Sequence, residues 1–374
     1  MKYVLLALSV CLLAGPARAE DGERNFAGSI QLDYLAIPTA KDPRQLTLDA
    51  ATFEASMKVS MDFSSQVSGA VKVCIACHGV ETGMAFFDLR VADQLNFRVG
   101  RLTPAFGNFP LRHDPANHRT SDKPLPYDMG RMVRIREWNE GVLPSPWVDN
   151  GVEINGTQFF DHGQVDYAIY AVSGPKGAVD GADFDFTQSR SAYYVDNNSE
   201  PSVGGRIGAT LATRRYSLSV GASTMTGHYD PDRKLSFWVA GADGQLQLGA
   251  LTVRAEYLLR RTEMALGASP ETRFKYGPDA DGKFASYFLK DGFYAEAELP
   301  VGALDVLARW DGLRRRGNVL AQSELRSKSD VYRYTVGGAY RLPSGVRLKV
   351  SGEVYDFSDF DDEVALHVGI AGAL

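Results

Sequence analysis

The sequence predicts an all-β protein, a transmembrane antiparallel β-barrel of about 16 strands. Apolar and polar residues alternate over many segments of strand length, and the links between these segments are alternately short and long. After residue 19, no run approaches the ~20 apolar residues of a membrane helix. The 374 residues are 44% hydrophobic with a mean hydropathy of −0.20, which is too polar for a bundle of membrane helices.

Residues 1–19 have the pattern of a secretory signal peptide. Lys2 gives a basic start, residues 4–13 form a short apolar core, and Ala17-Arg18-Ala19 is a small-x-small cleavage site. We therefore expect export to the outer membrane of a Gram-negative cell, with residues 20–374 forming one barrel. Removing Lys2 and Arg18 from the 40 basic residues leaves 38 against 46 acidic residues, a net charge of −8. This balance argues against a nucleic-acid partner.

Alternation with a period of two marks strands that have one apolar and one polar face. In residues 53–63 the odd positions are Phe, Ala, Met, Val, Met and Phe, whereas the even positions are Glu, Ser, Lys, Ser and Asp. Residues 332–342 follow the same pattern. The segments expected as strands are 26–36, 51–63, 66–75, 82–90, 95–103, 150–160, 164–174, 202–212, 215–226, 234–242, 246–261, 284–299, 303–314, 330–342, 345–357 and 363–374.

The links between these segments fall into two classes. Short turns are expected at 64–66, 91–94, 161–163, 213–214, 243–245, 300–302 and 343–344, and longer links at 37–50, 76–81, 104–149, 175–201, 227–233, 262–283, 315–329 and 358–362. Short turns at one rim and long loops at the other are typical of outer-membrane barrels, and a soluble β-sandwich has no reason to sort its loops in this way. A closed barrel also pairs every backbone group within lipid.

Three short motifs resemble the phosphate-selective porin O and P family. They are Phe97-Arg98-Val99-Gly100-Arg101-Leu102-Thr103-Pro104-Ala105-Phe106-Gly107, in which Ala105 is inserted between Pro104 and Phe106, then Asp149-Asn150-Gly151-Val152-Glu153-Ile154-Asn155-Gly156, and Tyr170-Ala171-Val172-Ser173-Gly174. The chain ends on Leu374, whereas outer-membrane proteins usually end on an aromatic residue. The resemblance implies a sixteen-stranded general or anion-preferring porin, a homotrimer, and a loop that folds into the pore.

The longest link, residues 104–149, is the expected pore loop because it is too long for a simple turn. Folded inward, it would narrow a lumen that sixteen strands otherwise leave open. The alternative is a solvated external loop. The residues expected to line the pore or its constriction are Arg98, Arg112, Arg119, Arg131, Arg134, Arg136, Arg206, Arg254 and Arg333.

Solute selectivity is left open by the inward-facing charges. Arginine suits planar contact with carboxylate or phosphate, and rings of arginine favour anions. By alternation, however, the inward positions carry nearly as many acidic as basic residues, so ladders of paired charge are an equally open interpretation. The sequence predicts a non-enzymatic porin for passive diffusion of small hydrophilic solutes, with anion preference undecided.

A separate motif, Cys74-Ile75-Ala76-Cys77-His78, contains both cysteines of the mature chain and matches the haem c attachment pattern. Three interpretations remain open. Covalent haem c on Cys74 and Cys77 would take His78 as one iron ligand, and His113, His118 or a loop methionine as the sixth. A Cys74–Cys77 disulfide would suit an oxidising compartment. A small metal site would use both thiolates, His78 and a loop histidine.

Two other functions follow from these features. A barrel with one haem c would transfer electrons across the outer membrane, and a barrel with a plugged lumen would be structural or adhesive. No other catalytic constellation is evident in the sequence, and phosphate-loop and dinucleotide glycine patterns are missing in the right context.

Overall fold

The structure is a computed structural model that describes residues 24–39, 50–76, 79–128, 133, 141–145, 147–177, 184, 196–264, 276–277, 283–320 and 325–373. The expected signal peptide, residues 1–19, lies outside these residues, as does Leu374. Within the described part of the chain, sixteen antiparallel strands close into one barrel. This confirms the fold class that the alternation predicts.

The barrel strands follow one another around the wall in sequence order. They are β1 Arg24–Ala36, β2 Ala51–Asp62, β3 Val67–Ala76, β4 Gly79–Ala92, β5 Leu95–Leu102, β6 Asp149–Phe160, β7 Gly163–Val172, β8 Ser202–Ala212, β9 Tyr216–His228, β10 Ser236–Leu248, β11 Leu251–Glu263, β13 Tyr287–Val301, β14 Leu304–Arg316, β16 Lys328–Arg341, β17 Arg347–Phe357 and β18 Glu363–Ala373. Two short strands, β12 Tyr276–Gly277 and β15 Val319–Leu320, pair with each other outside the barrel sheet.

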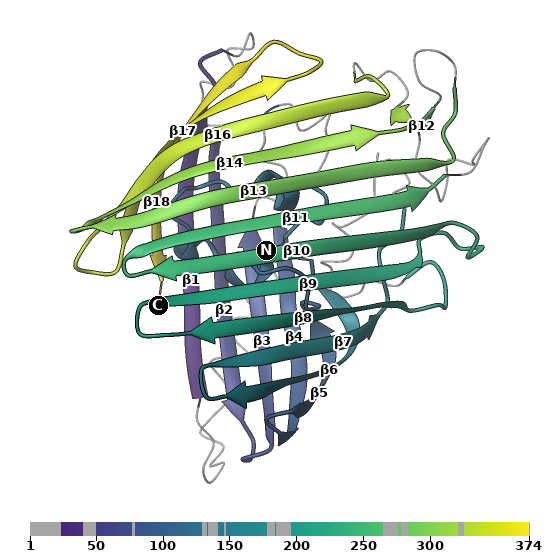
Figure 1. Ribbon diagram of the computed structural model, residues 1–374, viewed down its shortest axis with the longest axis vertical. Coiled ribbons are helices and arrows are strands. Elements are labelled where there is room, and N and C mark those ends of the chain that lie inside the picture. The colour runs from purple at the N-terminus through teal and green to yellow at the C-terminus, as the bar shows by residue number, and fades with distance from the viewer. Residues whose placement is uncertain are drawn as a thin grey trace, which may run out of the picture.

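Closure joins the first strand to the last, with Tyr34 of β1 opposite Val368 of β18. Figure 1 shows that the strands of the near wall, β7 to β14, run across the view, whereas those of the far wall, β1 to β5, run almost perpendicular to them. This crossing is the strand tilt that a closed sheet requires. All edges are therefore paired, apart from the short sheet of β12 and β15.

The two faces of the wall differ as the period-two pattern requires. Large apolar side chains are exposed on the outside, for example Phe26, Ile169, Val336 and Val350. The inside carries charged and polar residues, many of them buried against the long loop. Among the described residues, no helix is both long and apolar enough to cross a membrane.

One expected turn is wrong. Residues 243–245 were expected to separate two strands, but β10 continues to Leu248 and the turn falls at Gly249, whose φ is +58°. The sequence Asp243-Gly244 has the composition of a turn, yet Asp243 faces the lumen and binds Arg206 there. The aspartate is thus a lumen residue of a continuous strand.

The expected link at 76–81 is also wrong, because β3 extends to Ala76 and β4 begins at Gly79. Only residues 77 and 78 connect these strands, and both lie outside the described residues. Gly79 has a φ of +109°, a conformation that favours glycine. The pairing of β3 with β4 shifts register between Lys72 and Val73, which marks a β-bulge in β4. Gly79, the glycine of the expected link, therefore lies at the end of a hairpin, and Gly83 is the extra residue of the bulge.

Candidate functional site

Residues 103–148 connect β5 to β6 and enter the lumen. Their described part contains three short 3-10 helices, η3 Phe109–Arg112, η4 Pro115–Asn117 and η5 Leu125–Tyr127. Each of the three has proline in its first turn. Backbone N–H groups there have no acceptor within the helix, so the N–H that proline lacks costs no helical hydrogen bond. η4 packs against β1 and β18, and η5 packs against β13 and β14. The loop therefore folds inward as expected, and the alternative of a solvated external loop is wrong.

Glu256 of β11 forms the first anchor of this loop. Its buried carboxylate accepts hydrogen bonds from the backbone N–H of Phe109 at 2.7 Å and of Asn108 at 3.0 Å. The hydroxyls of Tyr127 on the loop and Tyr294 on β13 donate to the same carboxylate at 2.7 and 2.5 Å. Four donors satisfy a charge that is otherwise expensive to bury.

Gly107 makes this approach of the loop sterically possible. Its φ is +64°, and a Cβ at this position would lie 2.2 Å from the hydroxyl of Tyr127. Its N–H donates to Ser223 of β9 at 3.0 Å. Both the backbone conformation and the space require glycine here.

Asp122 forms the second anchor, between Arg309 of β14 and Arg333 of β16. Its carboxylate binds Arg309 and lies 2.8 Å from a guanidinium nitrogen of Arg333, and all three side chains are buried. Arg333 also donates to Asp311 at 3.0 Å and to the carbonyl of Lys123 at 2.7 Å. Burial alone would raise the pKa of Asp122, but Arg309 and Arg333 outweigh it and hold this pKa well below its ordinary value.

Lys72 of β3 and the loop residues His113 and Asp114 form the third anchor. The Lys72 ammonium donates to Nε2 of His113 at 3.0 Å and to Asp114, and Nδ1 of His113 lies 2.6 Å from the carbonyl of Pro110. Because a lysine ammonium can only donate, Nε2 accepts and Nδ1 carries the proton. Burial, and then the charge of Lys72, lowers the pKa of His113 to about 4. His113 is therefore neutral at pH 7.

A fourth set of contacts joins η4 to β1 and β17. Lys349 donates to the carbonyl of Pro115 at 2.6 Å and to the side-chain oxygen of Gln31 at 2.7 Å. The N–H of Ala116 donates to Ser29 of β1 at 3.0 Å. With the first three anchors, these contacts tie the described part of the loop to strands on several sides of the lumen.

In most ion pairs that remain partly exposed in the lumen, the basic side chain is more exposed than the acidic one, although Arg98 and Asp88 are nearly equal at 27% and 24%. The arginine side chain is the more exposed partner in Arg206–Asp243 (18% against 2%) and in Arg254–Glu296 (15% against 5%). Arg119 likewise covers Asp305, at 19% against 3%. Lys72–Asp114 is the reverse, with 4% and 32%. Most of these pairs therefore present their cation to the lumen and hold the carboxylate behind it.

The structure divides the expected pore arginines into three groups. Arg98, Arg112, Arg119, Arg206 and Arg254 lie in the lumen with partly exposed side chains. Arg333 is fully buried behind the loop. Arg131, Arg134 and Arg136 lie outside the described residues.

Only one member of the Cys74-x-x-Cys77-His78 motif can be described. Cys74 faces the lumen and forms no disulfide within the described residues, and its sulfur packs so closely against Gly83 that a Cβ on that glycine would lie 3.0 Å from it. Cys77 and His78 lie outside the described residues. Within the described part of the chain, no group of three His, Cys, Asp or Glu residues could hold a metal ion.

The two histidines expected as sixth haem ligands lie in the loop. His113 is committed to Lys72 and Pro110 through both ring nitrogens. His118 stacks on Phe109, with ring centroids 5.0 Å apart, and burial lowers its pKa well below its ordinary value. Both imidazoles thus pack as part of the loop in this structure.

Sequence reasoning missed the roles of Glu256, Tyr127 and Tyr294. Alternation correctly places Glu256 on the inner face, but it gives no signal that this carboxylate meets the loop rather than water. Whether Glu256 contacts the loop or water depends on the path of the loop through the lumen. An irregular loop has no repeating sequence pattern from which this path could be predicted.

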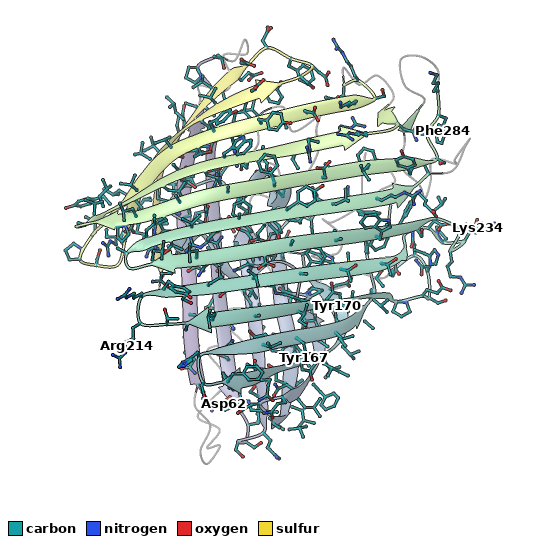
Figure 2. All side chains as sticks on the ribbon, in the orientation of Figure 1. Asp62, Tyr167, Tyr170, Arg214, Lys234 and Phe284 are labelled. Atoms are coloured by element: carbon teal, nitrogen blue, oxygen red, sulfur yellow. The ribbon has the colours of Figure 1, made fainter. Side chains whose placement is uncertain are left out.

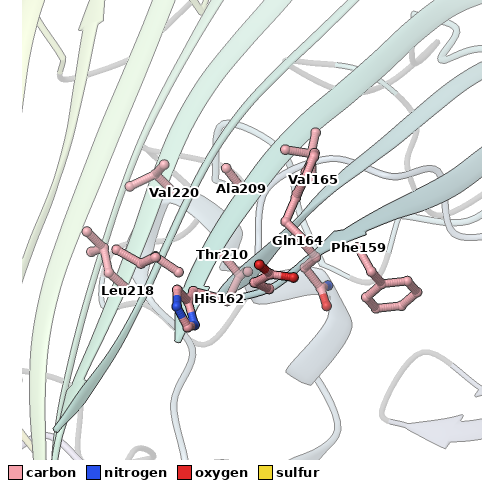
Figure 3. Close-up of a pocket in the computed structure, with 12 residues that line it drawn as sticks. Phe159, His162, Gln164, Val165, Ala209, Thr210, Leu218 and Val220 are labelled. Carbon is pink, nitrogen blue, oxygen red and sulfur yellow. The ribbon is translucent and has the colours of Figure 1, made fainter. Parts of the chain in front are cut away.

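A depression on the outer surface is separate from the lumen. Figure 3 shows it beside the 161–162 turn, where Phe159, His162, Leu218 and Val220 surround it. Leu218 and Val220 are lipid-side positions of β9, and both are exposed. It belongs to the outer apolar surface near the short-turn rim.

A closed sixteen-stranded barrel whose long loop folds into the lumen is an architecture that porins have. No protein-family model matches the chain, and no curated protein matches it. Its similarity to the phosphate-selective porin O and P family therefore rests on short motifs alone.

Solved structures match the fold over nearly the whole chain. The outer-membrane channel DcaP of Acinetobacter baumannii has 13% identity and a TM-score of 0.60, with 97% of this chain and 100% of that chain covered. An anion-selective porin of Comamonas acidovorans has 11% identity and a TM-score of 0.54, covering 95% and 100%. The outer-membrane protein OmpT of Vibrio cholerae, in a form described as a trimer, has 8% identity and a TM-score of 0.53, covering 95% and 100%. At these identities the similarity establishes the fold.

Proposed function

We propose that this protein is an outer-membrane porin that allows passive diffusion of small hydrophilic solutes. The observation that carries the proposal is the loop of residues 103–148, anchored inside a sixteen-stranded barrel by Glu256, Asp122 and Lys72. A barrel of this size leaves an aqueous lumen, and a rigid inward loop sets its narrowest width. The solved porins of the same fold add support.

The channel prefers anions. The partly exposed lumen pairs present arginine and hold their carboxylates behind, as in Arg206–Asp243 and Arg119–Asp305. A solute ion therefore meets the guanidinium first, although the formal charges nearly balance. Solvent-facing arginine favours carboxylate and phosphate groups, which it contacts in a planar bidentate geometry.

Planar-bilayer recording of the purified full chain tests both statements. We expect stepwise conductance and a reversal potential that indicates anion preference in a KCl gradient. Arg119→Gln/Arg254→Gln should shift the reversal potential towards cation preference. The matched control is Arg214→Gln/Arg215→Gln, which removes two cations from the exposed 213–215 turn. Absence of channels in any salt would refute the porin proposal, and an unshifted potential would refute the role of the lumen arginines.

Export and assembly belong to the same proposal. Cleavage after Ala19 would release the mature chain, and N-terminal sequencing of the outer-membrane form tests this. A homotrimer is supported by the trimer described for the Vibrio cholerae protein of the same fold. Crosslinking in native membranes followed by denaturing gels would distinguish a trimer from a monomer.

Electron transfer through haem c is the second candidate function, and the Cys74-x-x-Cys77-His78 motif is the observation that favours it. Bound haem would supply one-electron redox chemistry. The thiol of Cys74 already faces the lumen, close to Gly83 and the stem of Lys72. Peroxidase staining of denaturing gels, with protein made beside haem-attachment genes, separates this function from passive diffusion. A plugged structural or adhesive barrel would instead give no conductance and no stain.

A further inference from the structure

A row of cations crosses the outer face of the barrel near its long-loop rim. Arg261 of β11, Leu289 of β13, Arg316 of β14 and Lys328 of β16 lie directly opposite one another on consecutive strands. The side chains of residues paired in this way point to the same face of a sheet. Leu289 lies between Arg261 and Arg316 in this row. The row therefore presents three basic side chains away from the lumen.

Aromatic residues lie farther along the same face, beyond an intervening row of Leu259, Asp291, Arg314 and Asp330. Four residues along the strands towards the short-turn rim, the paired row is Tyr257, Phe293, Gly312 and Tyr332. The row after it contains Trp310 and Tyr334, and both side chains are about half exposed. Aromatic girdles of this kind mark the membrane interface of barrels, so the cations lie about 13 Å farther along the strands, on the headgroup side.

The acidic residues of this face neutralise only part of its positive charge. Asp291 binds Arg314 at 2.9 Å and accepts a hydrogen bond from Tyr257 at 3.2 Å. Glu263 lies 3.7 Å from Arg261, whose guanidinium also stacks over the ring of Tyr287 at 5.0 Å. These contacts neutralise Arg261, at the β11 end of the row, and Arg314, which lies between the row and the aromatic residues.

Arg316 and Lys328 are different. They are exposed and directly opposite each other, and like charges in that position destabilise a sheet. Within the described residues neither of them forms an ion pair. Of the acids on the same face, Asp330 lies opposite Arg314 and Asp356 lies opposite Tyr332. Two adjacent cations at the headgroup level of a lipid-facing wall thus lack an acidic partner within the part of the chain that the structure describes.

We propose that the outer face around Arg316 and Lys328 binds phosphate groups of the anionic lipid in the outer leaflet. The two cations contact the phosphate, Arg261 flanks it, and the aromatic and aliphatic rows below pack against the acyl chains. A lipid fits better than a protein partner because the surface below the cations continues as lipid-facing apolar wall to the short-turn rim, ending in Val301, Leu304 and Tyr340. The proposal rests on the outer-membrane location but not on channel activity.

The test is native mass spectrometry of the detergent-solubilised full chain titrated with lipid A, a phosphorylated glycolipid. Arg316→Gln/Lys328→Gln should bind lipid A about 25-fold more weakly, about fivefold for each cation removed. Arg214→Gln/Arg215→Gln is the matched control, because it removes two exposed cations at the opposite rim. Figure 2 shows Arg214 at one end of the barrel and Lys234 and Phe284, which lie at the long-loop rim, at the other. Its affinity should equal that of the unchanged protein.

Enzymatically dephosphorylated lipid A separates charge from acyl contact. We expect the unchanged protein to bind it as weakly as the double variant binds lipid A. Equal lipid A affinity of the two double variants, or equal binding of both lipids by the unchanged protein, would overturn the proposal. Heat-modifiable gel mobility establishes that each variant is folded, and bilayer conductance should be unchanged because neither cation faces the lumen.

Discussion

Replacing Asp122 by asparagine should release the long loop from the wall of the barrel. Asp122 is the only acidic residue that the described part of the loop inserts between Arg309 and Arg333, whose side chains are 2% and 0% exposed. Asparagine has nearly the same shape but no charge. The two guanidiniums would then repel each other in a buried site, with Asp311, Glu353 and, at 3.9 Å, Glu296 as their remaining acidic contacts.

The magnitude follows from the burial of this cluster. Breaking a buried ion pair by removing one partner costs about 3–5 kcal/mol, and the isosteric change lies at the low end, about 3 kcal/mol. This lowers the equilibrium constant for docking of the loop roughly 150-fold. The barrel itself should persist because its sixteen strands remain paired, so the effect is confined to the constriction.

Single-channel recording measures this effect directly. Asp122→Asn should give a larger or noisier conductance than the unchanged protein, and trypsin should cut the loop at its arginines faster. Asp161→Asn is the control, because Asp161 is exposed in the 161–162 turn, at the end of β6 opposite to the end that the loop joins. Quiet channels of unchanged conductance, together with unchanged proteolysis, would refute the assignment of Asp122 as an anchor.

Three further predictions concern acid, charge and haem. His113 has a folded pKa of about 4, below its ordinary 6.5, so the docked loop binds fewer protons than the released loop between these values. Docking should therefore be fully stable above pH 6.5 and lose up to about 3 kcal/mol as the pH falls to 4, and channel noise should rise over this window less in His113→Gln. Arg206→Gln should lower anion preference by leaving the charge of Asp243 uncovered, which the reversal potential measures, and an increased preference would contradict the lumen-facing role. If haem is attached, Cys74→Ala should abolish the peroxidase stain while conductance persists, whereas no stain in the unchanged protein removes haem c from consideration.

The strand order of this protein could be predicted from its sequence because one face of each strand meets lipid and the other meets water. This contrast is repeated in every strand, so small errors at single residues do not change the fold. The mistakes occur where glycine has two meanings. Gly244 follows Asp243 and lies inside β10, whereas Gly249 follows Leu248 and forms the turn, so the residue before each glycine misleads. Only the partner strand determines which of the two glycines bends the chain.

The roles of the inward arginines could not be predicted in the same way. Arg206 and Arg333 occupy equivalent alternating positions, but Arg206 is partly exposed in the lumen whereas Arg333 is enclosed by the loop and bound to Asp122. The difference arises from where the loop crosses the wall, and not from the strands that carry these side chains. The inner face therefore uses one residue type in two ways. Buried arginines fix the loop, and in the proposed channel the partly exposed arginines meet the solute, so the course of the loop determines which arginines remain exposed in the lumen.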